Sequence, residues 1–215
     1  MKPSWRVLLP SLALLLAISA GLSFALVKGP ATPALPGGAQ QAAPASGYDG
    51  MLALPVRAAP AIDLRNFRGR RVTLAQYRGK AVLVTFLYTH CPDVCPLITA
   101  NLGVALKMLG RLASQVQVLA VSVDPRGDTP AAVAGFLRRH GMTDRMQYLT
   151  GSAGELARAW VAWGVGAKAQ VGRPDLVAHS ALVYGVSARG RLTTIYPPSF
   201  EPRQIAHDVS RLAAH

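Results

Sequence analysis

Residues 81–96, AVLVTFLYTHCPDVCP, decide the fold, because an apolar run continues directly into a turn that contains both cysteines of the chain. The first eight residues are apolar, aromatic or β-branched and lack polar alternation, which is typical of a strand buried on both faces of a sheet. A helical pattern begins at Pro96 and continues through Leu112, with leucines on one stripe. We therefore expect a strand, a turn and a long helix at the centre of an α/β domain.

The segments on either side repeat this alternation of strand and helix. Capping residues mark helix starts at Thr129 and Ser152, whereas Gly164–Ala178 has no clear periodicity and is expected to be irregular. The expected strands are 61–64, 72–74, 81–88, 116–123, 146–149, 181–186 and 192–196, and the expected helices are 96–112, 129–141, 152–163 and 201–214. This order predicts a thioredoxin-like α/β fold, in which helices flank a central mixed β-sheet.

An uncharged segment of 21 residues, Val7–Val27, precedes this domain. At about 1.5 Å per helical residue it spans roughly 30 Å, the thickness of one bilayer core. Two basic residues precede the segment and one follows it, so we expect residues 1–28 to form a single transmembrane helix with a cytoplasmic N-terminus. A signal peptide cleaved near residues 23–25 is the alternative. The anchor places the C-terminal domain in the periplasm, at the bacterial inner membrane.

Residues 29–50 are rich in proline, alanine, glycine and glutamine and contain one charge, so we expect a flexible linker. The globular domain then covers residues 51–215. The net charge of +13 would suit nucleic acid, but an exported domain without a nucleic-acid motif argues against that partner. Four arginines cluster between Arg65 and Arg71. A solvated face is their simpler interpretation, and an anionic lipid or acidic partner is the alternative.

Two cysteines, four residues apart, limit the chemistry of the chain. They are too few for a disulfide scaffold or for a metal site built from cysteine alone. At a helix N-terminus, free N–H groups and the helix dipole lower the pKa of a thiol, and residues at i and i+4 share one face. A structural disulfide that closes so short a loop stabilises little. Cys91 and Cys95 are therefore candidates for dithiol redox chemistry or for binding a soft metal such as Cu(I).

Five histidines offer a third, neutral ligand for such a metal. His90 adjoins Cys91 but is expected to point to the opposite side, from where it can tune the thiol. His179 follows the irregular segment and precedes a buried strand, a usual place for functional side chains. Spacing alone still favours a structural role for a lone histidine. The other three are expected to be structural or solvated: His140, His207 and His215.

Residues 124–130, DPRGDTP, are typical of a turn that enters a capped helix. In such a turn Asp124 and Asp128 can simply accept hydrogen bonds from backbone N–H groups. A carboxylate near a metal site can instead tune its charge or contact a partner. The sequence leaves both roles open.

Three blocks, residues 88–96, 123–130 and 179–181, resemble in sequence and order the Sco/SenC family of copper chaperones. The resemblance implies one copper ion, as Cu(I) and also as Cu(II), and a metallochaperone rather than an enzyme. It implies delivery of the copper to the binuclear site in subunit II of cytochrome c oxidase or to another acceptor, by a protein that we expect to be a monomer. The implied metal ligands are Cys91, Cys95 and His179, and the implied supporting or partner-contacting residues are Asp124, Asp128 and His90.

Two positions depart from the pattern of this family. The family usually has an aspartate before the ligand histidine and an acidic residue at the end of the next strand, where this chain has Ala178 and Ser187. Both departures can weaken the orientation of His179. The alternative function is a thiol–disulfide oxidoreductase that reduces cysteines of the oxidase or of other exported proteins. Such enzymes on this fold generally use C-x-x-C and a proline just before the strand that faces the cysteines, and residues 176–186 contain no proline.

Overall fold

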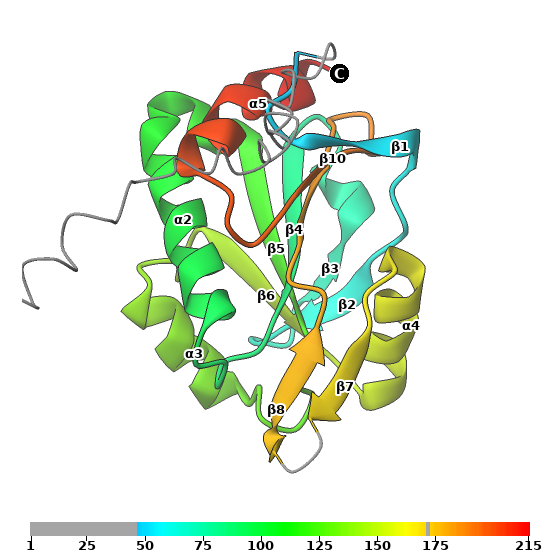
Figure 1. The fold of residues 1–215 in the computed structure, drawn as a ribbon, viewed down its shortest axis with the longest axis vertical. Helices are drawn as coiled ribbons and strands as arrows, with labels where there is room; N and C mark the ends of the chain where they lie inside the picture. The colour runs from blue at the N-terminus through cyan, green and yellow to red at the C-terminus, as the bar shows by residue number, and fades with distance from the viewer. Residues whose placement is uncertain (1–46, 171–172) are drawn as a thin grey trace, which may run out of the picture. The chain divides into compact units, whose positions relative to one another are not determined.

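A mixed eight-stranded sheet forms the centre of the computed structural model, which describes residues 47–170 and 173–215 (Figure 1). Its strands are β1 Met51–Ala58, β2 Asp63–Asn66, β3 Arg71–Thr73, β4 Ala81–Leu87, β5 Val116–Ser122, β6 Met146–Thr150, β9 Val183–Val186 and β10 Arg191–Tyr196. They follow the order β1-β10-β9-β4-β5-β6-β2-β3. A separate two-stranded sheet consists of β7 Ala167–Gln170 and β8 Arg173–His179.

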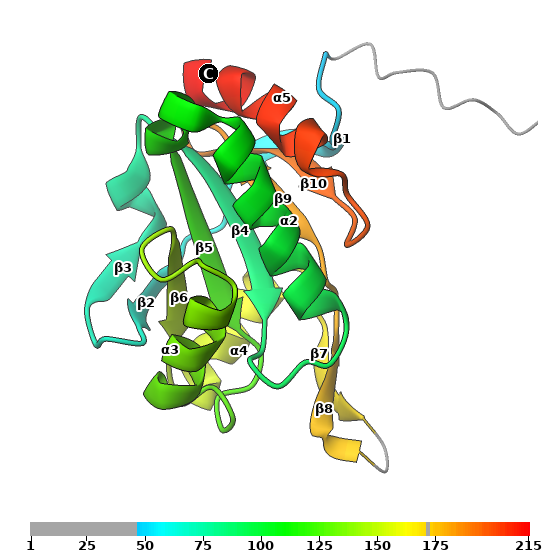
Figure 2. The ribbon, with the colours of Figure 1, turned by 90° about the vertical axis from the view of Figure 1, so that its left-hand side faces the viewer.

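Four α-helices accompany the sheet. They are α2 Val94–Met108, α3 Pro130–Arg139, α4 Ala153–Trp163 and α5 Pro202–Ala214, with the short 3₁₀ helices η2 Leu74–Tyr77 and η3 Gly110–Gln115. Helices α2 and α4 lie on opposite faces of the sheet, and α5 packs beside α2 (Figures 1 and 2). This confirms the predicted α/β class with a mixed sheet between helices.

Strand β4 is the fourth of the eight strands and therefore lies at the centre of the sheet. It pairs in parallel with β5 and antiparallel with β9, and every one of its seven residues is buried. On the α4 face, the ring of Trp163 packs against Phe86 and Tyr184 with centroids 6.1 and 5.3 Å away. The continuous apolar run that predicted a strand buried on both faces is thereby confirmed.

The predicted helix starts at Thr129 and Ser152 are confirmed by their capping bonds. The Thr129 hydroxyl accepts a hydrogen bond from the Ala132 N–H at 3.2 Å. Ser152 and Glu155 form a reciprocal capping box at the start of α4. The helix that was expected to begin at Pro96 begins two residues earlier, at Val94, and so includes Cys95. It ends at Met108, and the 3₁₀ helix η3 follows it before β5.

Three strands were missed by the sequence prediction, β1, β7 and β8. The segment expected to be irregular forms the β7–β8 hairpin, in which Ala167 lies opposite His179. Its strands lack the β-branched alternation that marks a strand, because the hairpin is a small separate sheet with little core to face. Strand β1 pairs with the sheet edge at β10, and its ladder shifts register between Leu52 and Arg57, on either side of Pro55. A proline is tolerated on an edge strand, where its missing N–H costs no bond.

The predicted membrane anchor and most of the predicted linker lie outside the described residues. Within residues 47–170 and 173–215, none of the helices has both the length and the apolar character needed to span a bilayer.

Candidate metal centre

The two cysteines lie where the centre of the sheet meets helix α2. Cys91 is in the loop after β4, and Cys95 is in the first turn of α2; both are buried and neither forms a disulfide. The Cys95 N–H donates a hydrogen bond to the Cys91 sulfur at 3.4 Å. The free N–H groups of the helix N-terminus therefore point at the Cys91 sulfur and favour its thiolate form.

His179 reaches this pair from the end of β8, 84 residues further along the chain. Its Nε2 lies 3.8 Å from the Cys95 sulfur, and the Tyr88 ring packs edge-on against the imidazole with centroids 5.8 Å apart. Burial lowers the pKa of His179, a shift that the Ser180 backbone opposes. The imidazole is therefore neutral at neutral pH, as a metal ligand must be.

The buried Nδ1 of His179 makes no hydrogen bond with any part of the chain that the structure describes. A ligand histidine normally donates its second ring N–H to a carboxylate or carbonyl, which fixes the ring and strengthens the metal-bound nitrogen. Ala178, where the family usually has aspartate, offers no such acceptor. Ser187, the second departure, is buried, and its hydroxyl accepts a hydrogen bond from the Arg191 N–H at 3.4 Å.

The two thiols differ in their affinity for protons. A hydrogen bond from the Cys95 thiol is the largest cause that lowers the pKa of Cys91, to about 6, and backbone N–H groups of residues 93 and 95 add to it. The same bond, together with burial, raises the pKa of Cys95 far above the usual value of a thiol. Burial also raises the pKa of Tyr88, beside Cys91, to about 12. At neutral pH the pair thus contains one thiolate and one thiol that donates to it.

We expect the reduced, metal-free chain to form a single thiolate near pH 6, while its second thiol stays protonated beyond pH 9. Thiolate absorbance at 240 nm, followed against pH, measures both steps. In Cys95→Ala the thiolate should form at higher pH, because the largest stabilising hydrogen bond is lost. One step near pH 9 that comprises both thiols would contradict this account.

Asp128 holds the loop that contains Cys91. This buried carboxylate accepts hydrogen bonds from the Thr89 N–H at 2.8 Å, the Ser122 hydroxyl at 2.6 Å and the Tyr148 hydroxyl at 2.8 Å. Burial raises its pKa. Of the roles that the sequence leaves open, the structure gives Asp128 a structural one: it connects the loop after β4, the end of β5 and the middle of β6, and fixes the backbone two residues before Cys91.

His90 lies in the loop that contains Cys91, and Asp124 lies in the neighbouring loop between β5 and α3. One Asp124 oxygen accepts the N–H groups of Arg126 and Gly127 at 3.2 and 3.0 Å and so closes the turn. The exposed His90 directs Nδ1 to the Thr89 hydroxyl at 3.2 Å, next to Gly127. Neither residue makes a hydrogen bond to the cysteines or to His179 within residues 47–170 and 173–215. A role in tuning the site or in contacting a partner stays a prediction for both.

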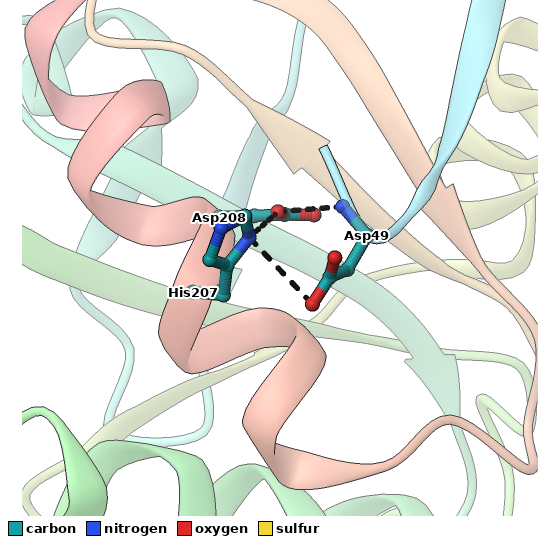
Figure 3. A group of neighbouring side chains, drawn as sticks. All are labelled: Asp49, His207 and Asp208. Carbon is teal, nitrogen blue, oxygen red and sulfur yellow. Dashed lines mark hydrogen bonds and ion pairs between the residues drawn. The ribbon is translucent and has the colours of Figure 1, made fainter. Parts of the chain in front are cut away.

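A second cluster, Asp49, His207 and Asp208, brings three possible ligand atoms within 4.8 Å of one another, the only such group among the described residues (Figure 3). The three atoms of Cys91, Cys95 and His179 are therefore more widely spread than this cluster. An ion bound between them would draw the β8 end and the cysteine loop together.

Asp208 and His207 of the second cluster already form hydrogen bonds with other parts of the domain. The buried Asp208 carboxylate already accepts the N–H groups of residues 49 and 50 and the Tyr196 hydroxyl, each at 2.8 Å. His207 directs Nδ1 to Asp208 at 2.9 Å, and its Nε2 lies 3.2 Å from the Arg211 guanidinium. The group fastens the start of the domain to α5. His207 is exposed, as the sequence predicted, and its ring is also held by the neighbouring Asp208 and by Arg211.

Tyr88 is a residue of the site to which the sequence prediction gave no role of its own. Its ring packs on His179 and its side chain lies beside the Cys91 sulfur, so it separates the imidazole from solvent. Its position as the last residue of the apolar run before the turn with the cysteines could have indicated that it lies at the site. Of the six predicted site residues, the structure brings Cys95 to both Cys91 and His179, and leaves Asp124, Asp128 and His90 in the supporting loops.

The chain is similar to several known proteins. The family model described as SCO1/SenC matches residues 56–214. The mitochondrial protein SCO2 homolog of Bos taurus is 33% identical over 157 residues, 69% of this chain and 57% of its own length. The chain thus spans little more than half of that relative.

Solved structures give the same result. The structure of Bradyrhizobium japonicum ScoI with copper bound is 30% identical, with a TM-score of 0.64, and covers 72% of this chain and 99% of its own. BsSco, described as a member of the Sco family of cytochrome c oxidase assembly proteins with a disulfide switch, is 25% identical, with a TM-score of 0.63 and coverage of 74% and 95%. With a family match over most of its length and these relatives, the chain belongs to the SCO1/SenC family.

Proposed function

We propose that the chain is a membrane-anchored copper metallochaperone that binds one copper ion through Cys91, Cys95 and His179. The convergence of the Cys95 sulfur and the His179 Nε2, 3.8 Å apart across 84 residues, is the observation that supports this most. Two sulfurs and one neutral imidazole form a soft donor set that suits Cu(I), and Cu(II) is the second state we propose. The copper-bound structure of a relative that is 30% identical adds support.

Copper is the cargo, and the residues prepare its site. Cys91 already favours its thiolate, so binding has to displace mainly the Cys95 proton. The neutral His179 contributes its Nε2 lone pair, and Tyr88 excludes water on one side. The acceptor takes the ion by replacing these ligands one at a time. Oxidation of the two thiols to a disulfide releases two electrons and two protons and removes both sulfur ligands, so loading requires the reduced pair.

The whole-chain setting is part of the proposal. Residues 1–28 would anchor the chain in the bacterial inner membrane, residues 29–50 would serve as the linker, and residues 51–215 would bind copper in the periplasm as a monomer. The acceptor would be subunit II of cytochrome c oxidase or another copper protein. The description of BsSco as belonging to a family of oxidase assembly proteins supports this choice.

A thiol–disulfide oxidoreductase is the second candidate, favoured by the difference between the two thiols. A thiolate at Cys91 beside a buried, protonated Cys95 is an arrangement that can attack a disulfide and then resolve it. The reduced full chain should be mixed with an excess of an oxidised acceptor domain and a thiol reductant that regenerates the Cys91/Cys95 pair, with the direct reaction of the reductant subtracted. The copper-loaded chain should be mixed with the reduced acceptor. We expect transfer of one copper per chain and no repeated turnover of the disulfide. Repeated turnover by a chain that binds no copper would establish the oxidoreductase instead.

Ala178→Asp is expected to tighten Cu(I) binding about tenfold, at the lower end of the 10–100-fold effect of partners that support a ligand. The added carboxylate raises the basicity of the adjacent imidazole, whose Nδ1 has no hydrogen bond to the described residues. Competition with a coloured Cu(I) chelator measures the change. Ala178→Asn, similar in shape but uncharged, is the control, and equal affinities for the two variants would count against the role of the charge.

A further inference from the structure

An exposed apolar stripe follows the outer side of helix α2. Leu97, Val104 and Met108 share one helical face because they are separated by seven and four residues, and Leu112 continues the row in η3. Their exposed fractions are 46, 44, 57 and 43%. Large apolar side chains exposed elsewhere in the described residues are isolated ones, Met51 and Val161.

The stripe is separate from the face of α2 that forms the core. The inward face buries Ile98, Leu102 and Leu106 against the sheet, and α5 packs along the helix. Both views show the outer side of α2 uncovered by the other described elements (Figures 1 and 2). Asn101 interrupts the row between Leu97 and Val104 and donates a hydrogen bond to the Phe200 carbonyl at 3.1 Å. Exposed apolar residues that gather on one face and that the core does not use mark an interaction surface.

The position of the stripe links it to the metal centre. Leu97 lies two residues after Cys95, in the same helical turn that presents the sulfur. Eleven residues separate Leu97 from Met108, which corresponds to about 16 Å along the helix. A molecule that lies on the stripe therefore reaches the first turn of α2, which contains Cys95, at one end and lies farther from that turn at the other.

The charges around the stripe select the kind of partner. Residues 94–115 include two cations, Lys107 and Arg111, both exposed, and no acidic residue. A second copy of this chain would bring these cations against like charges, which is unfavourable. Trp and Tyr are enriched where proteins meet a membrane interface, and residues 94–115 contain neither. The complement is a protein surface with an apolar patch and an acidic rim.

We propose that the Leu97–Leu112 stripe is the docking surface for the protein that accepts the copper, and that this protein presents an apolar patch bordered by carboxylates. The inference rests on the proposed copper-chaperone function. Docking along α2 aligns the acceptor's own ligands with the N-terminal end of the helix, so that ligand exchange at Cys95 occurs within the complex. The stripe supplies affinity, and Lys107 and Arg111 supply the orientation and part of the association rate.

The test uses the full chain in nanodiscs of zwitterionic lipid, loaded with Cu(I), and the soluble copper-accepting domain of oxidase subunit II. Val104→Glu/Met108→Glu should weaken binding of that domain at least tenfold and slow copper transfer to the same extent, with one copper still bound per chain. Val161→Glu alters an apolar residue that is 81% exposed on α4 and should bind within twofold of the wild type. Lys107→Glu/Arg111→Glu should weaken binding and reduce its dependence on salt.

Each outcome separates this inference from the copper-binding proposal. If the double glutamate variant binds copper and the acceptor domain as the wild type does, the docking surface is elsewhere and copper binding stands. A wild-type chain that binds copper but not the acceptor domain also overturns the inference. Loss of binding to anionic vesicles alone, with acceptor binding unchanged, would assign the stripe to the membrane. A wild-type chain that binds no copper would overturn the proposed function itself.

Discussion

Cys95→Ala is expected to weaken Cu(I) binding by more than about 100-fold. Loss of a group that only supports a metal ligand costs 10–100-fold, and loss of the ligand itself should exceed that range. Cys95 also contacts both other proposed ligands, through its backbone N–H to the Cys91 sulfur and through its own sulfur to His179. Competition titration of the reduced full chain against a Cu(I) chelator of known affinity gives the change.

Two further variants make this expectation specific to sulfur. Cys95→Ser retains the shape and the buried position of the side chain but replaces the soft donor with a hard one, so it should lose copper as Cys95→Ala does. Cys91→Ala should also bind more than about 100-fold more weakly, since it removes the sulfur that is already a thiolate. Affinities within tenfold of the wild type in both Cys95 variants would exclude this cysteine as a ligand.

Asp128→Ala is expected to destabilise the domain by about 2–4 kcal/mol. The substitution removes the acceptor of three hydrogen bonds and leaves the Thr89 N–H and two hydroxyl groups buried without it, at about 1–3 kcal/mol for each unsatisfied group. The burial that raises the pKa of Asp128 also costs stability, and the variant no longer has this cost. This offsets part of the lost stability. Urea unfolding followed by circular dichroism measures the difference.

Asp124→Ala is the matched control on the same loop. Its carboxylate closes a partly exposed turn, so its loss should cost less than about 1 kcal/mol. The pH dependence gives a second check. Because the pKa of Asp128 is raised in the folded state, its contribution is complete below its unfolded pKa of about 4 and falls as the pH rises through the folded value. Asp128→Ala should lose this decline, and equal stability losses in both variants would contradict the structural role.

The elements that the sequence predicted correctly are those whose signal is local. The apolar run of β4 and the caps of α3 and α4 are properties of a few adjacent residues, and the structure confirms them. Strands β1 and β7–β8 depend on pairing with partners that the local pattern does not reveal. The bonds from the N–H groups of residues 49 and 50 to Asp208 could not be predicted either, because they join the two ends of the domain.

The candidate site shows the same division. The position of Cys91 and Cys95 at a helix start followed from the strand-to-helix transition and from their spacing. For His179, spacing favoured a structural role, and only the resemblance to a family indicated a ligand. The fold explains why spacing was insufficient, since the end of β8 approaches Cys95 through a hairpin that had no strand signal. The structural role of Asp128 required knowledge that residues from the loop after β4, from β5 and from β6 meet at its side chain.

The central claim is that two sulfurs and the His179 nitrogen bind one copper ion. The most direct measurement is a Cu(I) titration of the reduced full chain, combined with X-ray absorption at the copper edge, for the wild type and His179→Ala. His140→Ala, a histidine stacked on Phe136 away from the cysteines, is the control. We expect one tightly bound ion with two sulfur ligands and one nitrogen ligand in the wild type and in His140→Ala, and weak binding without that nitrogen in His179→Ala. A wild-type spectrum with sulfur ligands alone, unchanged by His179→Ala, would contradict the account.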